Sequence, residues 1–183
     1  LRPTNENIPF VIYRLGLVHF EQFTSIDRDQ KNIETAKSYF ETVIKKHPKS
    51  PYVADAIEKL AKCREYLAER EFYAASFYLK EEKYPAARER FENIIRRYRN
   101  TPTAVKALYQ LGESYQLEKN NVKASLAYEA LIRHYPDNPL AKKARVQLSR
   151  LDKEDQDPLA MLLMRDGRPV FTLPPEDDQQ KEV

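Results

Sequence analysis

The chain has little glycine, one cysteine and no tryptophan. Its 183 residues include only three glycines, and Ala, Leu, Glu, Lys and Arg dominate. This composition of good helix formers predicts an all-α protein. The lone Cys63 excludes an intramolecular disulfide, so it leaves the redox compartment open. The sequence contains no run of about 18 apolar residues, so it predicts no membrane-spanning helix.

One segment of sixteen residues occurs three times, at 36–51, 87–102 and 124–139. Each copy starts with alanine, has an aromatic residue four positions later and then a glutamate, and ends on proline. These positions are Ala36, Phe40, Glu41 and Pro51; Ala87, Phe91, Glu92 and Pro102; and Ala124, Tyr128, Glu129 and Pro139. Repetition at such spacing predicts a solenoid, whose units bury their apolar faces by stacking on one another.

The residues around these copies resemble the tetratricopeptide repeat (TPR) family. Leu111, Gly112 and Tyr115, followed by Ala124 and Tyr128, match its W-x2-L-G-x2-Y and A-x3-F patterns. Ile12, Leu15, Gly16 and His19 match the first pattern earlier in the chain, and the middle copy has Ala75 in place of glycine. We expect a right-handed stack of antiparallel helix pairs that cross closely at the small residue.

The domain organisation follows from this register. We expect one TPR solenoid over residues 1–151, with hairpins at about 8–48, 51–99 and 102–136 and a closing helix at 139–151. Each helix after a repeat should start at an N-cap residue followed by proline: Ser50-Pro51, Thr101-Pro102 and Asn138-Pro139. Residues 152–183 should form an irregular acidic tail, whose apolar segment 158–164 docks on the last helix or in the groove.

Two departures from the repeat stand out. Gly16 lies 20 positions before Ala36, whereas the later copies have 12, which places an eight-residue insertion within 24–33. Residues 51–80 contain no internal glycine or proline, so we expect one continuous helix of about 45 Å at 1.5 Å per residue. This helix would fuse the end of one repeat to the start of the next.

The combination of these features resembles the BamD (ComL) family of outer-membrane lipoproteins. The resemblance rests on three features: Asp27, Arg28 and Asp29 in the insertion, H-P-x-S-x-Y at residues 47–52, and a long helix that ends in E-x-x-x-A-x-x-Y at residues 71–78. It covers residues 1–151. Gln116 stands after the tyrosine of the last full repeat, where that family's partner-binding basic residue is expected.

The resemblance implies a non-catalytic scaffold of the β-barrel assembly (BAM) machinery. It would lie on the periplasmic face of the outer membrane of a Gram-negative bacterium, held by a lipid anchor upstream of these residues. Its protein partners would be the POTRA domains of the barrel-inserting subunit, other assembly lipoproteins and unfolded barrel substrates. The alternative is a generic TPR adaptor, such as a secretin pilot, a division-linked envelope protein or a cytoplasmic adaptor. The opening residues 1–3 resemble the end of another repeat, so we also expect upstream sequence.

The chain offers no motif for catalysis. It has no phosphate loop, zinc-ligand spacing or catalytic serine motif. His47 falls where the sister copies have tyrosine, which indicates packing rather than metal binding. We interpret Cys63 as a small buried side chain, and the repeated glutamates as a solvated face. We therefore expect no enzyme, cofactor or metal.

Charge is unevenly distributed. Residues 1–151 carry 27 basic and 19 acidic side chains, whereas residues 152–183 carry 4 and 9. Basic clusters lie at 96–99 and 142–145, and glutamates are interspersed between them. This favours an acidic protein partner or anionic lipid over nucleic acid, which we do not expect to bind.

A concave groove is the expected binding surface. In TPR proteins this groove is lined by the first helix of each helix pair. The lining residues lie one, five and eight positions after the site that holds tryptophan in the W-x2-L-G-x2-Y pattern. Here these residues are Tyr13, Leu17 and Phe20; Phe72, Ser76 and Leu79; and Tyr109, Glu113 and Gln116. Such a largely apolar groove suits an extended or helical partner segment, although a neighbouring hairpin could cover some of the rings.

Overall fold

A computed structural model describes residues 7–22, 30–154, 164–165 and 168–169. Within these ranges the chain forms seven α-helices and a two-stranded antiparallel pair. The helices are α1 (Ile8–Glu21), α2 (Gln30–Lys46), α3 (Val53–Lys80), α4 (Tyr84–Arg97), α5 (Pro102–Leu117), α6 (Asn121–His134) and α7 (Pro139–Glu154). The strands are β1 (Met164–Arg165) and β2 (Arg168–Pro169). The predicted all-α solenoid is confirmed.

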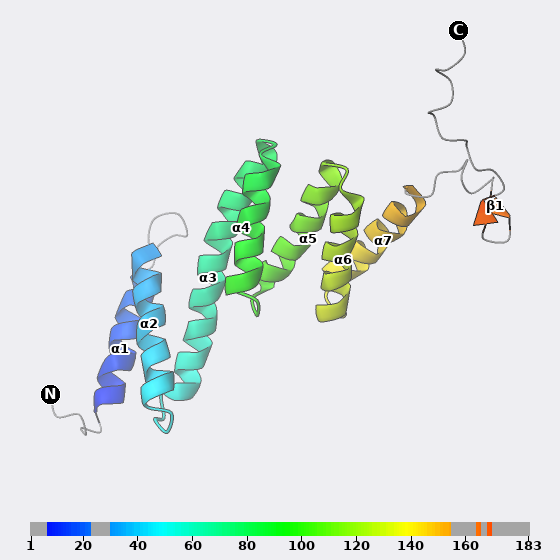
Figure 1. Cartoon of the computed structure of the whole chain (residues 1–183). Helices are drawn as coiled ribbons and strands as arrows, with labels where there is room; N and C mark the ends of the chain where they lie inside the picture. The colour runs from blue at the N-terminus through cyan, green and yellow to red at the C-terminus, as the bar shows by residue number, and fades with distance from the viewer. Residues whose placement is uncertain (1–6, 23–29, 155–163, 166–167, 170–183) are drawn as a thin grey trace, which may run out of the picture.

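The helices form a row in which each packs against its neighbours in the sequence (Figure 1). In addition, α3 contacts α5 and α5 contacts α7, so the first helices of successive units also meet. This is the contact pattern of a solenoid, in which stability comes from each hairpin and its interface with the next.

Two hairpins close on a glycine. A Cβ atom built on Gly16 would lie 2.7 Å from Cε1 of Phe40, and one built on Gly112 would lie 2.5 Å from Cε1 of Tyr128. Both rings are fully buried. The rings therefore occupy the space that any larger side chain would need, as the sequence predicted. The middle hairpin has Ala75 at this position and Phe91 as its buried ring.

A second set of small residues packs each first helix against the preceding unit. Ala56 in α3, Ala107 in α5 and Ala144 in α7 are all fully buried and occupy equivalent positions. Seven residues further along each helix, Cys63, Ser114 and Leu151 are also fully buried. Burial raises the pKa of the Cys63 thiol to about 12, which disfavours the reactive thiolate.

The long helix is confirmed as one element of 28 residues, but it starts two residues later than the proline pattern predicted. The Ser50 hydroxyl accepts a hydrogen bond from the Tyr52 N–H at 3.3 Å, in a turn that precedes the helix. By contrast, Thr101 caps α5 as predicted, since its hydroxyl accepts from the Ala104 N–H at 3.2 Å. Asn138 accepts from the Leu140 N–H at 2.9 Å at the start of α7.

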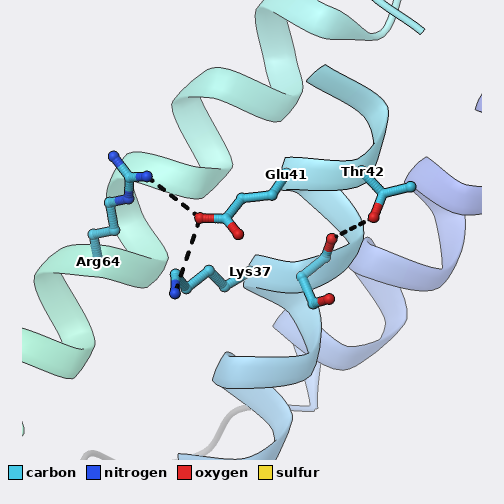
Figure 2. Close-up of polar contacts among 5 residues, drawn as sticks. Lys37, Glu41, Thr42 and Arg64 are labelled. Carbon is cyan, nitrogen blue, oxygen red and sulfur yellow. Dashed lines mark hydrogen bonds and ion pairs between the residues drawn. The ribbon is translucent and has the colours of Figure 1, made fainter. Parts of the chain in front are cut away.

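Carboxylates join successive repeats. Glu41 on α2 accepts from Arg64 on α3 at 3.3 Å and lies 3.9 Å from Lys37 (Figure 2). At the equivalent position of the next repeat, Glu92 accepts from the Tyr115 hydroxyl at 3.3 Å. Expected on a solvated face, these two glutamates instead lie half-buried between helices.

A further carboxylate caps a helix from outside. Glu65 on α3 accepts from the Thr103 hydroxyl at 2.8 Å and from the Thr103 N–H at 3.2 Å. This N–H belongs to the first turn of α5, where no intrahelical acceptor exists. The contact ties the start of α5 to the middle of α3.

The remaining predictions concern the insertion and the tail. Residues 30–33, assigned to the insertion, form the first turn of α2, and Ile33 is buried in the core. Asp27, Arg28 and Asp29 lie outside the described residues, as does most of the segment 152–183.

Replacing Gly112 with valine should destabilise the fold by about 2 kcal/mol, because the new side chain overlaps the buried Tyr128 ring. The matched control is Ala61→Val, at the equivalent and exposed position of α3, which should cost less than about 1 kcal/mol. Urea denaturation measures both free energies. Equal effects would show that the ring is not a steric barrier.

Replacing Glu65 with alanine should cost about 2 kcal/mol, because a buried N–H and hydroxyl lose a charged acceptor. The exposed Glu89→Ala on α4 should change the free energy of unfolding by less than about 0.5 kcal/mol. Chemical denaturation compares the two variants. A cost for Glu65→Ala no larger than that of the control would contradict a capping role.

Candidate functional site

Two adjoining hollows follow the first helices of the solenoid. The first has a volume of about 730 Å³ and lies between α3 and α5. The second has a volume of about 400 Å³ and continues toward α7. They share Phe72 and Lys106, so we treat them as one surface, the α3–α5–α7 groove. Its lining is Glu69, Arg70, Phe72, Tyr73, Ala74, Ser76, Thr103, Lys106, Tyr109, Gln110, Glu113, Leu140 and Lys143.

The groove brings together four of the nine residues predicted to line a binding surface. Phe72 and Ser76 come from α3, and Tyr109 and Glu113 come from α5. The Phe72 ring is half-buried against the buried ring of Phe91, with centroids 5.6 Å apart. Tyr109 is held in the same way against Tyr128, at 5.7 Å. Each ring in the groove therefore rests on the core ring of its own hairpin.

Two more predicted residues of these hairpins lie outside the groove lining. Leu79 is half-buried and packs against the core. Gln116 accepts a hydrogen bond from the Tyr128 hydroxyl at 3.1 Å, so its side chain holds the α5–α6 hairpin together.

The predicted residues of α1 lie elsewhere. Tyr13 is only 8% exposed, and its ring stacks on Tyr52 at 5.3 Å. Leu17 and Phe20 are half-buried. The Phe20 ring lies 6.1 Å from that of Tyr66, and the Lys59 ammonium lies 5.5 Å above it. These side chains join α1 to α3, and they line neither hollow of the groove.

Sequence reasoning missed the charged and exposed members of the groove. Tyr73 is 75% exposed, and Lys106 and Lys143 are also exposed. The TPR positional rule selects only three fixed positions of each first helix and omits the other residues of that helix. Lys106 lies three residues before Tyr109, so helical periodicity could have identified it.

The groove has mixed electrostatics. Arg70, Lys106 and Lys143 contribute positive charge, and Glu69 and Glu113 contribute negative charge. Burial raises the pKa of the Glu113 carboxyl, while a hydrogen bond with Tyr109 and the charge of Lys143 oppose the rise. Gln110 donates to this carboxylate at 2.6 Å. The arrangement offers aromatic faces and charged groups for a polypeptide.

The part of the chain that the structure describes contains no cluster of three or more potential metal ligands. Likewise, none of its helices is both long enough and apolar enough to cross a membrane.

Comparison with known proteins adds sequence relatives to this geometry. The family model described as YfiO, outer membrane lipoprotein, matches residues 1–128. Outer membrane protein assembly factor BamD of Rickettsia prowazekii is 35% identical over 117 residues, which cover 64% of this chain and 47% of the relative. The proteins of the same name from Vibrio cholerae and Pasteurella multocida are 32% and 30% identical, over 63% and 68% of this chain and 52% of each relative. The chain thus spans about half the length of the relatives it matches.

Replacing Glu113 with glutamine should stabilise the protein at neutral pH. Burial makes the pKa of the Glu113 carboxyl higher in the folded protein than in the unfolded chain. The wild type therefore loses stability as the pH rises from the unfolded-state pKa through the folded-state pKa. Below the unfolded-state pKa the carboxyl is neutral in both states, and the loss disappears. The gain in Tm should therefore be present at pH 7.5 and shrink at pH 4. The exposed Glu129→Gln serves as control. A gain that is equal at both pH values would contradict this origin.

Proposed function

Because the chain belongs to the YfiO family of outer membrane lipoproteins, we propose that it acts as a non-catalytic scaffold in the assembly of outer-membrane β-barrel proteins. The relatives named above carry the name of an assembly factor, which supports this role. Family membership supports the predicted location at the periplasmic face of the outer membrane.

The observation that carries the proposal is the α3–α5–α7 groove. It crosses three first helices that are fixed to one another by direct contacts, so its shape is set before a partner arrives. A preformed surface loses less conformational entropy on binding than a mobile one. The groove therefore has the rigidity that a scaffold requires.

The chemistry of the groove suits a protein ligand. Phe72, Tyr73 and Tyr109 present ring surfaces, and exposed aromatic residues are frequent centres of protein interfaces. Lys106 and Lys143 offer charges for acidic groups around such a centre. This combination fits a folded domain that inserts an apolar side chain, as well as an extended strand.

We assign this surface to the POTRA domains of the barrel-inserting subunit. Other assembly lipoproteins and unfolded barrel substrates are further partners of the same machinery that the resemblance implies. Folded domains agree best with the preformed groove, because a partner that is already ordered loses less conformational entropy on binding than an unfolded strand.

The test is a titration of the chain against the purified POTRA domains of the same bacterium by isothermal calorimetry. We expect a Kd of tens of micromolar or tighter, weakened about tenfold or more by Tyr73→Ala or Lys106→Glu. The control variants are Phe77→Ala, another exposed ring on α3, and Lys119→Glu, neither of which lines the groove. Absence of binding by a folded, helical sample would refute the assignment.

A further inference from the structure

A third hollow, of about 250 Å³, lies between α3 and the connection from α4 to α5. It shares no lining residue with the α3–α5–α7 groove. We refer to it as the arginine hollow. Its lining is Ile57, Leu60, Ala61, Arg64, Arg96, Arg97, Tyr98, Arg99, Asn100 and Thr101.

The hollow exists because no second helix folds back over the first half of α3. The first half of α3 repeats α5 with a spacing of 51 residues, so Ile57 corresponds to Leu108 and Ala61 to Gly112. In the α5–α6 hairpin, Leu108 is 7% exposed and the Tyr128 ring covers Gly112. Ile57, in contrast, is 53% exposed. The helix continues to Lys80 where a regular repeat would form its second helix, so this apolar face is left open.

In the closing helix α7, the same face is exposed to solvent and carries polar residues. In α7, Arg145 and Ser149 occupy the positions of Leu108 and Gly112, and both are exposed. Polar residues there remove any need for a covering helix. The apolar Ile57 and Ala61 on α3 are therefore a departure from the chain's own pattern for an open face.

Arginines surround this apolar surface. Arg64 comes from α3, and Arg96, Arg97 and Arg99 come from the end of α4 and the turn after it. Arg64 pairs with Glu41 (Figure 2). Among the described residues, no acidic group forms an ion pair with the other three. No aspartate or glutamate lines the hollow.

The helix dipole explains only part of this cluster. Basic residues in the last turn of a helix interact favourably with its carboxyl end, which accounts for Arg96 and Arg97 on α4. Arg99 lies beyond that helix and Arg64 lies on another one. The guanidinium groups of Arg96, Arg97 and Arg99 have no carboxylate partner among the described residues, so a carboxylate-bearing ligand can pair with them.

We propose that the arginine hollow docks an acidic segment of a partner protein, which inserts one bulky apolar side chain between the arginines. The inserted side chain would contact Ile57 and the floor formed by Leu60 and Tyr98, both nearly buried. Carboxylates on either side would pair with the rim, where the guanidinium fork matches their geometry. A recessed floor suits a single side chain better than a flat membrane surface. The proposal is independent of the POTRA assignment.

The experiment uses the whole chain and a fluorescein-labelled peptide of twelve residues, all glutamate or serine except for one central phenylalanine. Fluorescence anisotropy in 50 mM salt should show binding that the double variant Arg96→Glu/Arg99→Glu weakens at least tenfold. Replacing the phenylalanine of the peptide with glycine should weaken binding to the wild type at least fivefold.

The matched control is Arg133→Glu/Lys142→Glu, which changes the net charge equally. Arg133 occupies the position of Arg96 in the last repeat, and both control residues are exposed. All four substituted residues are exposed, so circular dichroism should confirm that both double variants are folded. Binding by the control should change less than twofold.

Four outcomes would overturn the proposal. Equal weakening by the two double variants would indicate attraction by net charge alone. Absence of peptide binding at 200 μM would exclude the acidic segment. Binding of phosphatidylglycerol vesicles, in place of the peptide, that depends on Arg96 and Arg99 would assign the hollow to a membrane. Tighter binding of a peptide of residues 152–164 would assign it to the acidic tail of this chain itself.

Discussion

The solenoid depends on the close approach of two helices at one small residue, with an aromatic ring filling the space beside it. At Gly16 and Gly112 the ring carbons of Phe40 and Tyr128 come within the reach of a single added methyl group. Such contacts fix how far apart the helices lie and how they are rotated. Because the same geometry recurs along the chain, the first helices present equivalent faces, and a continuous groove can form across them. The groove is thus a consequence of the hairpin core rather than of the residues that line it.

The second constraint is the stripe by which each first helix packs on the unit before it. Ala56, Ala107 and Ala144 mark this stripe on α3, α5 and α7. The first half of α3 obeys it as α5 does, while the second half pairs with α4 as the opening helix of a new hairpin. One helix therefore satisfies two repeat patterns in succession. The extra length leaves one face of its first half uncovered, which creates the arginine hollow.

The sequence was sufficient to predict the helices and their pairing, because these depend on local spacing. Gly112 and Tyr128 belong to a pattern with a known physical meaning, and the missing turn in α3 follows from the absence of glycine and proline in 51–80. Contacts between repeats were harder to predict from the sequence. The Glu65 cap on α5 joins residues 38 positions apart and is absent from the other repeats, so no periodicity reveals it.

The binding surface was predictable only in part for a related reason. The positional rule found Phe72 and Tyr109 because each follows a fixed site in its own helix. It missed Lys106, which lies before the first position that the rule selects on α5, and Lys143, which lies on the closing helix α7 outside the three hairpins that the rule covers. It also selected Tyr13, which Tyr52 covers at the start of the unusually long α3. A rule derived from regular repeats is therefore least accurate beside the irregular helix.

The fused helix gives this chain a property that regular repeats lack. In a regular solenoid two distant surfaces are connected through a turn and an interface, and small rotations at each interface add up. Here Ile57 and Arg64 of the arginine hollow and Phe72 and Tyr73 of the groove lie on a single helix of 28 residues. Main-chain hydrogen bonds run through the whole helix, so the two surfaces hold a fixed separation and rotation. Two proteins bound at these sites would be oriented by α3 itself, with no intervening joint. Orienting two proteins in this way is what the proposed scaffold role requires.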